Sequence, residues 1–504
     1  MPRPALLLVL LRLALAQAPP AGTLELYLRS DDKPTAARVY ITDAEGKPHL
    51  VPGAVTYSRR GEDHSVVDQN AEIPLPAGKY QVRAEKGPEF RTVEKSVTVT
   101  PGEPVRLDVD VPRFYNMNEM GWYSGDLHIH RSPEDLPVIV RAEDLNVAPT
   151  ITRHLGGSRP PGPYPASPFL PVDASHFVSV HNQEVERLVQ GHGAVVLLNT
   201  PEPAAAEGLT VLHPTETEFC RRARALGGFI DGEKPIWKNI PVNVALGLID
   251  AIGIVNNHFH PRAVMAEAEK WGSMDRDKPA YQTPAGFAQW MMDLYYSFLD
   301  CGFRIPVSAG SASGVMPVWP GYERVYVHLS APFTYRQWFQ DLKTGRSVAT
   351  NGPLLGVFLD GQPPGAQVDF QGPGAYILVI DAQSQDRLDR IEILFNGQVI
   401  RSFAGGGNAA FRTAVNLTIP EPGWLVVRCF EPNAQTVRYA HSSPFYFLRN
   451  GKLPVKRATA QRWADYVRKL AASVKAADYP SGEAYDAAQA TFREAEAVYR
   501  RLAR

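Results

Sequence analysis

The sequence has few cysteines, almost no net charge and no long apolar run beyond its first residues. The only cysteines are Cys220, Cys301 and Cys429, far apart and without a Cys-x-x-Cys pair. They predict neither a disulfide framework nor a zinc–thiolate site, and we expect buried free thiols. The formal net charge of -1 argues against a general affinity for nucleic acid or anionic membranes.

The N-terminal residues have the composition of a secretory signal. Arg3 supplies a positive charge, the run from Ala5 to Leu15 is apolar except for Arg12, and small residues precede an expected cleavage after Ala16. A short membrane anchor is the alternative, but the run is shorter than the roughly 18 residues that a span needs. We therefore predict a signal peptide in residues 1–16, a secreted or periplasmic protein, and no membrane span after signal removal.

The hydrophobic pattern divides the remaining chain into four segments. Short alternating runs separated by turns predict a β-sandwich in residues 17–113 and a second one in residues 353–449. In residues 114–352, strand-like runs alternate with helical stretches, which is typical of an α/β domain. Residues 450–504 are rich in Ala, Arg, Glu and Lys and predict a tail of two amphipathic helices.

One helix of the middle segment is marked at both ends. Thr283 is a suitable N-cap, Pro284 fits the first helical position, and Gly302 lies just past the end of a long amphipathic run. We expect the aromatic residues of this run to pack in the core rather than to bind a cofactor.

Histidine is unevenly distributed among the segments. Of the 13 histidines, all but His49, His64 and His441 lie in residues 114–352. Within Asp126-Leu127-His128-Ile129-His130, residues two apart project from the same face of a strand. Two imidazoles at that spacing can bind one cation, and Asp126 can orient one of them. The alternative is a polar strand face whose hydrogen bonds are satisfied without a metal.

A second His-x-His pair, His258 and His260, ends the apolar run at residues 249–255. The carboxyl ends of strands are where α/β sheets and barrels place their sites. Two such pairs at strand ends are hard to explain as core histidines, so they favour a metal site. Glu184, His192 and Glu233 are further candidates, although each alone is equally consistent with an ordinary loop residue.

The segment from Gly125 to His130 resembles the first motif of the PHP (polymerase and histidinol phosphatase) superfamily of metal-dependent hydrolases. The order of segments resembles the carbaryl-hydrolase branch of that superfamily. The resemblance implies a multi-domain α/β plus β fold, in which a distorted (β/α)7-type barrel is flanked by two β-sandwich domains and a C-terminal helical tail. It also implies that a metal-activated water hydrolyses a phosphoester, a carboxyl ester or a carbamate.

The resemblance also gives a ligand set and shows where this chain departs from the family. The implied metal ligands are His128, His130, His154, Glu184, His192, Glu233, His258 and His260. They would hold one or two divalent ions of Zn, Mn or Fe, which these ligand types do not distinguish. Arg153 stands in the place of an aspartate, Glu233 in that of a histidine, and Ala312 in that of a further aspartate. A mononuclear site, a binuclear site and an inactive descendant are therefore all open.

Two basic residues lie within the implied site, and no catalytic residue is identified. Arg153 and Lys234 are candidates for binding an anionic substrate or an oxyanion, or for replacing the charge of a missing cation. The expected function is that of an exported metal-dependent hydrolase that acts on a small-molecule or glycan substrate. The alternative is a non-catalytic secreted binding protein built on a degenerate PHP-like domain.

Overall fold

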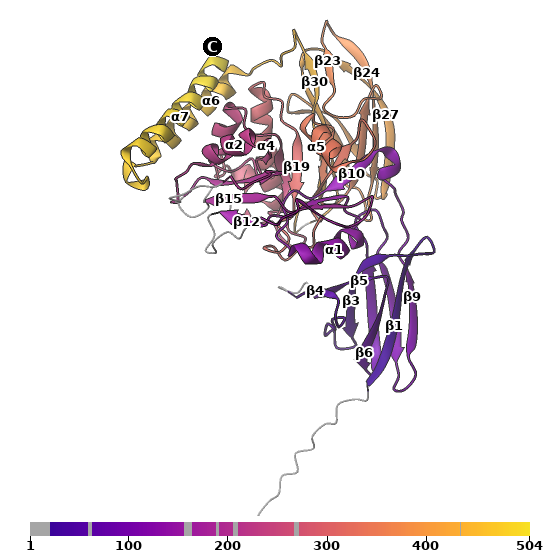
Figure 1. The fold of residues 1–504 in the computed structure, drawn as a ribbon. Helices are drawn as coiled ribbons and strands as arrows, with labels where there is room; N and C mark the ends of the chain where they lie inside the picture. The colour runs from indigo at the N-terminus through magenta and orange to yellow at the C-terminus, as the bar shows by residue number, and fades with distance from the viewer. Residues whose placement is uncertain are drawn as a thin grey trace, which may run out of the picture.

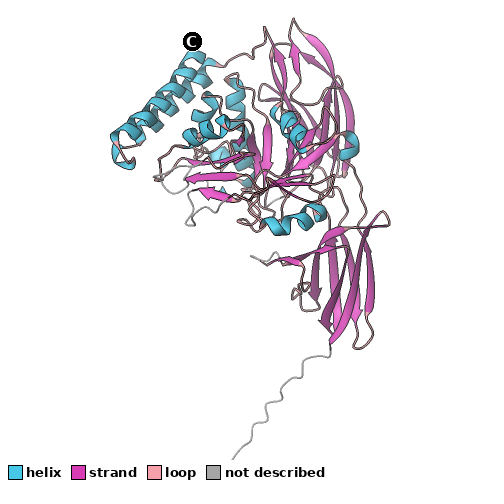
Figure 2. Cartoon of the chain, viewed as in Figure 1, coloured by secondary structure: helices cyan, strands magenta, loops and turns pink. Residues whose placement is uncertain are grey.

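The structure is a computed structural model that describes residues 21–58, 63–155, 164–187, 191–204, 210–266, 272–433 and 435–504. The predicted signal peptide, residues 1–16, lies outside the described residues. Among them, strands are more numerous than helices, and most of the helices lie in the upper part of the molecule (Figure 2). The chain runs from an N-terminal β-domain through a mixed region to a C-terminal β-region and two final helices (Figure 1).

The N-terminal β-domain contains two sheets that enclose one hydrophobic core. Its strands are β1 (Ala21–Ser30), β2 (Lys33–Pro34), β3 (Ala36–Asp43), β4 (Val55–Tyr57), β5 (His64–Asp68), β6 (Asn70–Pro76), β7 (Gly78–Glu85), β8 (Val93–Val99) and β9 (Val105–Asp110). In one sheet β1 pairs with β2, β6 and β9, and the other has the order β4-β5-β3-β7-β8. Burial alternates along β1, so Leu24, Leu26 and Leu28 point into the core.

A short helix, α1 (Leu136–Ala142), attaches this domain to the rest of the molecule. Its Ile139 packs against Val66 of β5. At the end of the helix, the buried carboxylate of Glu143 accepts a hydrogen bond of 2.5 Å from the Arg38 guanidinium of β3. An apolar contact and a buried ion pair therefore both join the two parts.

In the described residues of the middle segment, twelve strands are combined with short and long helices. Its strands are β10 (Trp122–Gly125), β11 (Val147–Pro149), β12 (Arg153–Leu155), β13 (Phe169–Leu170), β14 (Phe177–Ser179), β15 (Gln183–Arg187), β16 (Gly193–Leu198), β17 (Phe229–Asp231), β18 (Ile252–Asn256), β19 (Val307–Gly310), β20 (Arg324–His328) and β21 (Ser347–Thr350). After α1, its α-helices are α2 (Glu216–Ala225), α3 (Ile240–Ala245), α4 (Pro284–Asp300) and α5 (Tyr335–Lys343).

The expected (β/α)7-type barrel, and with it the predicted fold class, is wrong. The strands of the middle segment lie in three sheets: one with the order β12-β15-β16-β17, one formed by β18 and β19, and one that contains β13-β14-β11-β10-β20-β21. β15, β16 and β17 pair antiparallel, as do β10 and β20, whereas such a barrel requires parallel strands with a helix after each. Apolar runs indicate strands, but they do not indicate the direction in which the strands pair.

The chain beyond β10 is held between two neighbouring segments. The amide of His130 donates to the Ser313 carbonyl (2.7 Å) on one side, and the amide of Ile151 donates to the Ile129 carbonyl (2.7 Å) on the other. Residues 126–130 are therefore extended and fixed by backbone hydrogen bonds on both edges.

The C-terminal β-region contains β22 (Leu354–Leu359), β23 (Gln367–Asp369), β24 (Gly374–Gln383), β25 (Arg390–Phe395), β26 (Gln398–Ala404), β27 (Ala410–Ile419), β28 (Gly423–Phe430), β29 (Tyr439–Ser442) and β30 (Phe445–Leu448). Because β21 pairs with β29, the sheet that begins at β13 continues through β29, β28, β25 and β26. A three-stranded sheet, β22-β24-β27, shares a hydrophobic core with it. The sheet therefore crosses the boundary expected at residue 352.

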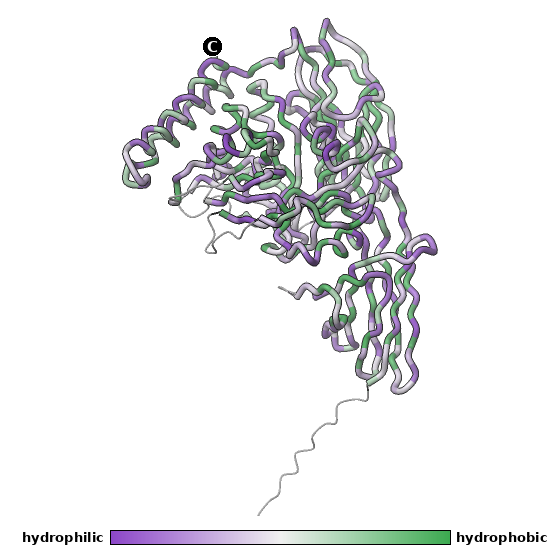
Figure 3. Tube along the Cα trace, viewed as in Figure 1, coloured by the Kyte–Doolittle hydropathy of each residue, from purple (hydrophilic) through white to green (hydrophobic). Residues whose placement is uncertain are grey.

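The last two helices, α6 (Arg457–Ser473) and α7 (Gly482–Leu502), pack on the middle segment. Hydrophobic and hydrophilic residues alternate along both (Figure 3). Trp463 stacks on Phe298 of α4, with ring centroids 4.9 Å apart, and the Tyr499 hydroxyl donates to the Pro241 carbonyl at 2.8 Å. Among the described residues, no helix combines the length and apolarity that crossing a bilayer requires.

Two local predictions are confirmed. Helix α4 begins at Pro284, and the Thr283 hydroxyl accepts a hydrogen bond of 3.0 Å from the Gly286 amide, as an N-cap does. The cysteines Cys220, Cys301 and Cys429 are buried and unpaired. Their burial among apolar side chains raises the pKa of each thiol, as expected for packing residues.

Candidate metal centre

Three side chains converge at the end of the extended segment that follows β10: His128, His130 and Glu184. The Nε2 atoms of the two imidazoles are 3.0 Å apart. Glu184 Oε1 lies 3.4 Å from His128 Nε2, and Glu184 Oε2 lies 3.1 Å from His130 Nε2. His128 and Glu184 are buried, and the side chain of His130 is 11% exposed.

The spacing of these donor atoms matches a shared cation. Nitrogen and oxygen ligands lie about 2.0–2.2 Å from Zn²⁺, so two ligands at angles of about 90–110° are roughly 2.8–3.6 Å apart. The separations between the His128, His130 and Glu184 donors all fall in that range. His128, His130 and Glu184 can therefore bind one divalent ion together.

The opposite charges within the cluster stabilise one another. Burial alone would raise the pKa of Glu184, but His128 and His130 hold it well below the ordinary value. Burial alone would lower the pKa of His128, but Glu184 and Glu233 raise it. The raised pKa of His128 favours its protonated form, so a metal ion and a proton compete for this imidazole.

A network of backbone bonds holds His128 in place. The buried carboxylate of Asp126 accepts hydrogen bonds from the His128 amide (3.0 Å), the Ser311 amide (3.0 Å) and the Gly321 amide (2.7 Å). Burial raises the pKa of Asp126, although these bonds oppose the shift. Asp126 thus orients the backbone of His128, not an imidazole ring.

Glu233 lies on the other side of the His128 ring. Its Oε1 is 3.3 Å from His128 Nδ1 and also bonds to the ammonium of Lys234. Its Oε2 accepts a hydrogen bond of 2.8 Å from Trp237 Nε1. With both oxygens engaged, Glu233 is placed to hold the His128 ring, as an outer carboxylate does in metal sites.

A second group of donors shares Glu184 with the first. β12 and β15 pair so that His154 is opposite Glu184, and their Nε2 and Oε2 atoms are 3.4 Å apart. His154 Nε2 lies 2.7 Å from Oε2 of Glu186, which was not among the predicted ligands. Glu184 and Glu186 are two residues apart in one strand, the same spacing that identified the histidine pairs. The group is more open, since the His154 side chain is 34% exposed.

The second His-x-His pair, His258 and His260, lies outside the donor groups. The buried ring of His258 stacks parallel to Phe287 (centroids 6.1 Å apart), and burial together with the charge of Lys234 keeps its pKa well below the ordinary value. His128 also lowers the pKa of His258, so the two rings lie in one region. His260 Nε2 lies 3.2 Å from the Pro317 carbonyl. Neither ring belongs to the two donor groups.

The structure places His192 and Arg153 away from the donors. His192 packs against Phe492 of α7, and burial lowers its pKa to about 4. It lines a cavity beside the C-terminal helices. Arg153 precedes His154 in β12, so their side chains project from opposite faces of the strand.

Two buried acids near the cluster were not singled out by sequence. Burial raises the pKa of Asp231 to about 7, and the carboxylate accepts a hydrogen bond of 2.6 Å from the Glu233 amide. Burial raises the pKa of Glu323 well above its ordinary value, and Asp126 adds to the shift. Neither oxygen of Glu323 has a hydrogen-bond partner among the described residues. Asp231 is two residues from Glu233, but nothing in the sequence distinguishes Glu323.

Comparisons with known proteins give little guidance. No family model matches the sequence, and no curated protein matches it. Among solved structures, the minor pilin of Streptococcus agalactiae is similar at 20% identity, over 19% of this chain and 46% of the pilin, with a TM-score of 0.17. A streptococcal ancillary pilin is similar at 16% identity, over 23% of this chain and 37% of the pilin, with a TM-score of 0.15. The chain thus spans less than half of either pilin.

Proposed function

We propose that this chain is an exported metal-dependent hydrolase that cleaves an ester-type bond in a small-molecule or glycan substrate. The observation that carries the proposal is the convergence of buried His128 and Glu184 with half-buried His130 at the donor spacing of one divalent ion. The resemblance of residues 125–130 to the first PHP motif supports the same chemistry. The export rests on the composition of residues 1–16.

The chain supplies oriented ligands for such an ion. A bound divalent ion would lower the pKa of a coordinated water toward neutrality and polarise the scissile group. Glu233 faces His128 Nδ1 and therefore holds the proton on that nitrogen, which leaves the Nε2 lone pair directed at His130 and Glu184. The backbone bonds on both edges of residues 126–130 fix the two imidazoles, so little reorganisation is needed when the ion binds.

His154 and Glu186 are placed to move a proton at the edge of the cluster. Their side chains are 34% and 28% exposed, so substrate and water reach them more easily than the buried donors. Glu186, and to a lesser degree Glu184, raises the pKa of His154 despite its partial burial. In this proposal the pair accepts the proton of the attacking water and returns it to the leaving group.

Lys234 balances charge rather than binding substrate. Its ammonium is buried, bonds to Glu233 and lies 4.9 Å from the Trp237 ring centroid. Of the two roles open for this residue, the geometry favours the replacement of a cation's charge.

The test is hydrolysis by purified protein that has been loaded with Zn²⁺, Mn²⁺ or Fe²⁺. p-Nitrophenyl esters of phosphate, acetate and a carbamate are the substrates, and the variants are His128→Ala and His154→Ala. We expect metal-dependent release of nitrophenol that His128→Ala abolishes. His154→Ala should lower kcat about 10²–10⁴-fold, as loss of a general base does, while retaining the ion held by His128, His130 and Glu184.

The matched control is His49→Ala, which removes a histidine of the N-terminal β-domain that pairs with Asp43. It should leave both metal content and hydrolysis unchanged. Stoichiometric metal without hydrolysis of any ester would contradict the catalytic part of the proposal and leave a metal-binding protein. A folded protein without metal would contradict both parts and favour the non-catalytic binding protein.

A further inference from the structure

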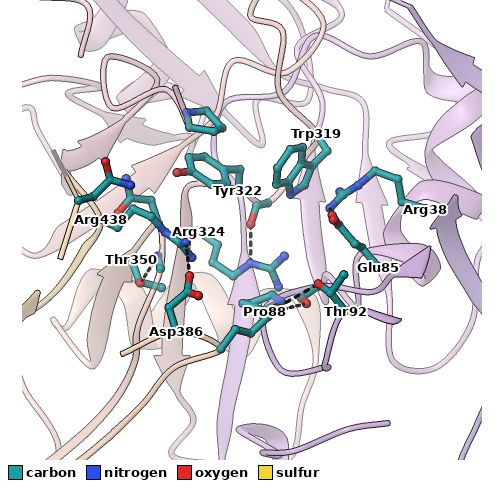
Figure 4. A pocket seen from close by; sticks show the side chains of 17 residues that line it. Arg38, Glu85, Pro88, Thr92, Trp319, Tyr322, Arg324, Thr350, Asp386 and Arg438 are labelled. Carbon is teal, nitrogen blue, oxygen red and sulfur yellow. Dashed lines mark hydrogen bonds and ion pairs between the residues drawn. The ribbon is translucent and has the colours of Figure 1, made fainter. Parts of the chain in front are cut away.

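A separate cavity lies where the N-terminal β-domain, the middle segment and the C-terminal β-region meet (Figure 4). Its volume is about 340 Å³. Residues from all three parts line it: Arg38, Trp319, Tyr322, Arg324, Asp386 and Arg438. Clefts between domains are where proteins commonly bind small molecules, and this volume is at the lower end of the usual range.

Two of the three guanidinium groups around the cavity each pair with two carboxylates. Arg38 pairs with the carboxylates of Glu85 and Glu143, each at 2.5 Å, and stacks on Trp319 at 3.8 Å from its ring centroid. Arg438 lies 2.8 Å from an oxygen of Asp386, and a second carboxylate lies 2.9 Å from it. These two cations need no further anion.

Arg324 differs from them. It is only 1% exposed, and its hydrogen bonds go to the carbonyls of Gly321 (2.6 Å) and Glu143 (3.2 Å). Its Nη1 has no hydrogen-bond partner among the described residues, and it forms no ion pair among them. The carboxylate of Glu143 lies near enough to attract Arg324 electrostatically, but its hydrogen bond is to Arg38 and it accepts none from Arg324 Nη1. A buried guanidinium N–H without an acceptor is costly, so an acceptor, best an anionic one, is expected beside Nη1.

The other walls of the cavity add polar groups. The Tyr322 hydroxyl is buried and likewise lacks a hydrogen-bond partner among the described residues. Thr92, Asn351 and Gln385 supply further hydroxyl and amide groups. The cavity therefore offers a positive charge and a hydroxyl for an anion, surrounded by donors and acceptors for other polar groups.

We propose that this cavity binds a small polyhydroxylated carboxylate, such as a sugar acid. Its carboxylate would accept hydrogen bonds from Arg324 Nη1 and the Tyr322 hydroxyl, and its hydroxyl groups would bond to the polar walls. Because only one nitrogen of Arg324 is available, the contact is a single charge-assisted bond rather than a bidentate pair. The site lies outside the His128 cluster and does not depend on the metal.

The test is isothermal titration calorimetry of the full chain with gluconate, lactate, glucose and inorganic phosphate. Gluconate should bind more tightly than lactate, because it has more hydroxyl groups, and glucose should not bind measurably because it lacks the carboxylate. Arg324→Met should weaken gluconate at least about 10-fold, as expected for a hydrogen bond to a charged group. Tyr322→Phe, which removes only the hydroxyl, should weaken it roughly 2- to 10-fold.

Two controls keep the outcome interpretable. Arg412→Met removes an arginine that pairs with Asp381 in the C-terminal β-region and should leave gluconate binding unchanged. His128→Ala should also bind gluconate normally, so failure of the metal proposal and failure of this one are distinguishable. If Arg324→Met does not fold, Tyr322→Phe alone still tests the site.

Several results would overturn the proposal. Equal binding of glucose and gluconate would show that no carboxylate is recognised, and tighter binding of phosphate would show the wrong anion. The proposal is also wrong if neither gluconate nor lactate binds to the wild-type chain, or if Tyr322→Phe binds gluconate as tightly as the wild type does.

Discussion

Gly310 packs directly against His128 of the candidate metal centre. A Cβ at this residue would lie 2.4 Å from His128 Cβ and 3.0 Å from the His128 amide nitrogen. Non-bonded carbons need about 3.5–4.0 Å, so Gly310→Ala must push His128 away by roughly 1 Å. Overpacking of this kind costs about 1–3 kcal/mol of stability. We expect the displaced imidazole to lower Zn²⁺ affinity about 10–100-fold, as loss of an orienting partner does.

The assay combines urea unfolding with Zn²⁺ titration against a chromogenic chelator. The control is Gly372→Ala, because a Cβ at Gly372 meets nothing within 4 Å. The control should match the wild type in both measurements. If Gly310→Ala also binds Zn²⁺ with wild-type affinity, His128 is not held by this contact, and the reasoning about the centre's rigidity fails.

The remaining predictions concern stability and are all measured by urea unfolding. Trp463→Ala removes a fully buried ring that stacks on Phe298, and it should cost about 3–5 kcal/mol if α6 is docked as described; a loss below about 1 kcal/mol would contradict the docking. Thr283→Ala removes the N-cap of α4 and should cost about 1 kcal/mol, whereas no loss would mean that the cap bond is not formed in solution. Burial lowers the pKa of His441 to about 3, so its neutral form contributes stability that is present above pH 6.5 and lost as the pH falls toward 3. His441→Gln should therefore flatten the pH dependence by about 1.4 kcal/mol per pH unit between pH 6 and 4, and an unchanged slope would refute this assignment.

The sequence singled out several side chains that lie together in the structure, although the fold predicted around them was wrong. Period-two spacing placed His128 and His130 on one face because strand geometry is local. Extending the same rule from Glu184 would have found Glu186. Glu323 could not be found, since a single acidic residue in a loop carries no periodic signal.

The sequence did not allow us to predict which way the loops turn or how the strands pair. His192 and His260 belong to the same histidine-rich segment, but their local chain turns them toward α7 and toward Pro317. The barrel failed for a related reason, because β16 has the hydrophobic run of a buried strand yet pairs antiparallel with both β15 and β17. Pairing depends on contacts that are distant in sequence, which local hydrophobic patterns do not specify.

The most direct measurement is the metal content of the purified full chain after loading with Zn²⁺ and removal of excess ion. The account predicts one or two tightly bound ions per chain in the wild type and in His49→Ala, and loss of at least one ion in His130→Ala. A folded wild-type chain that retains no ion, or a His130→Ala variant that retains as much as the wild type, would contradict it.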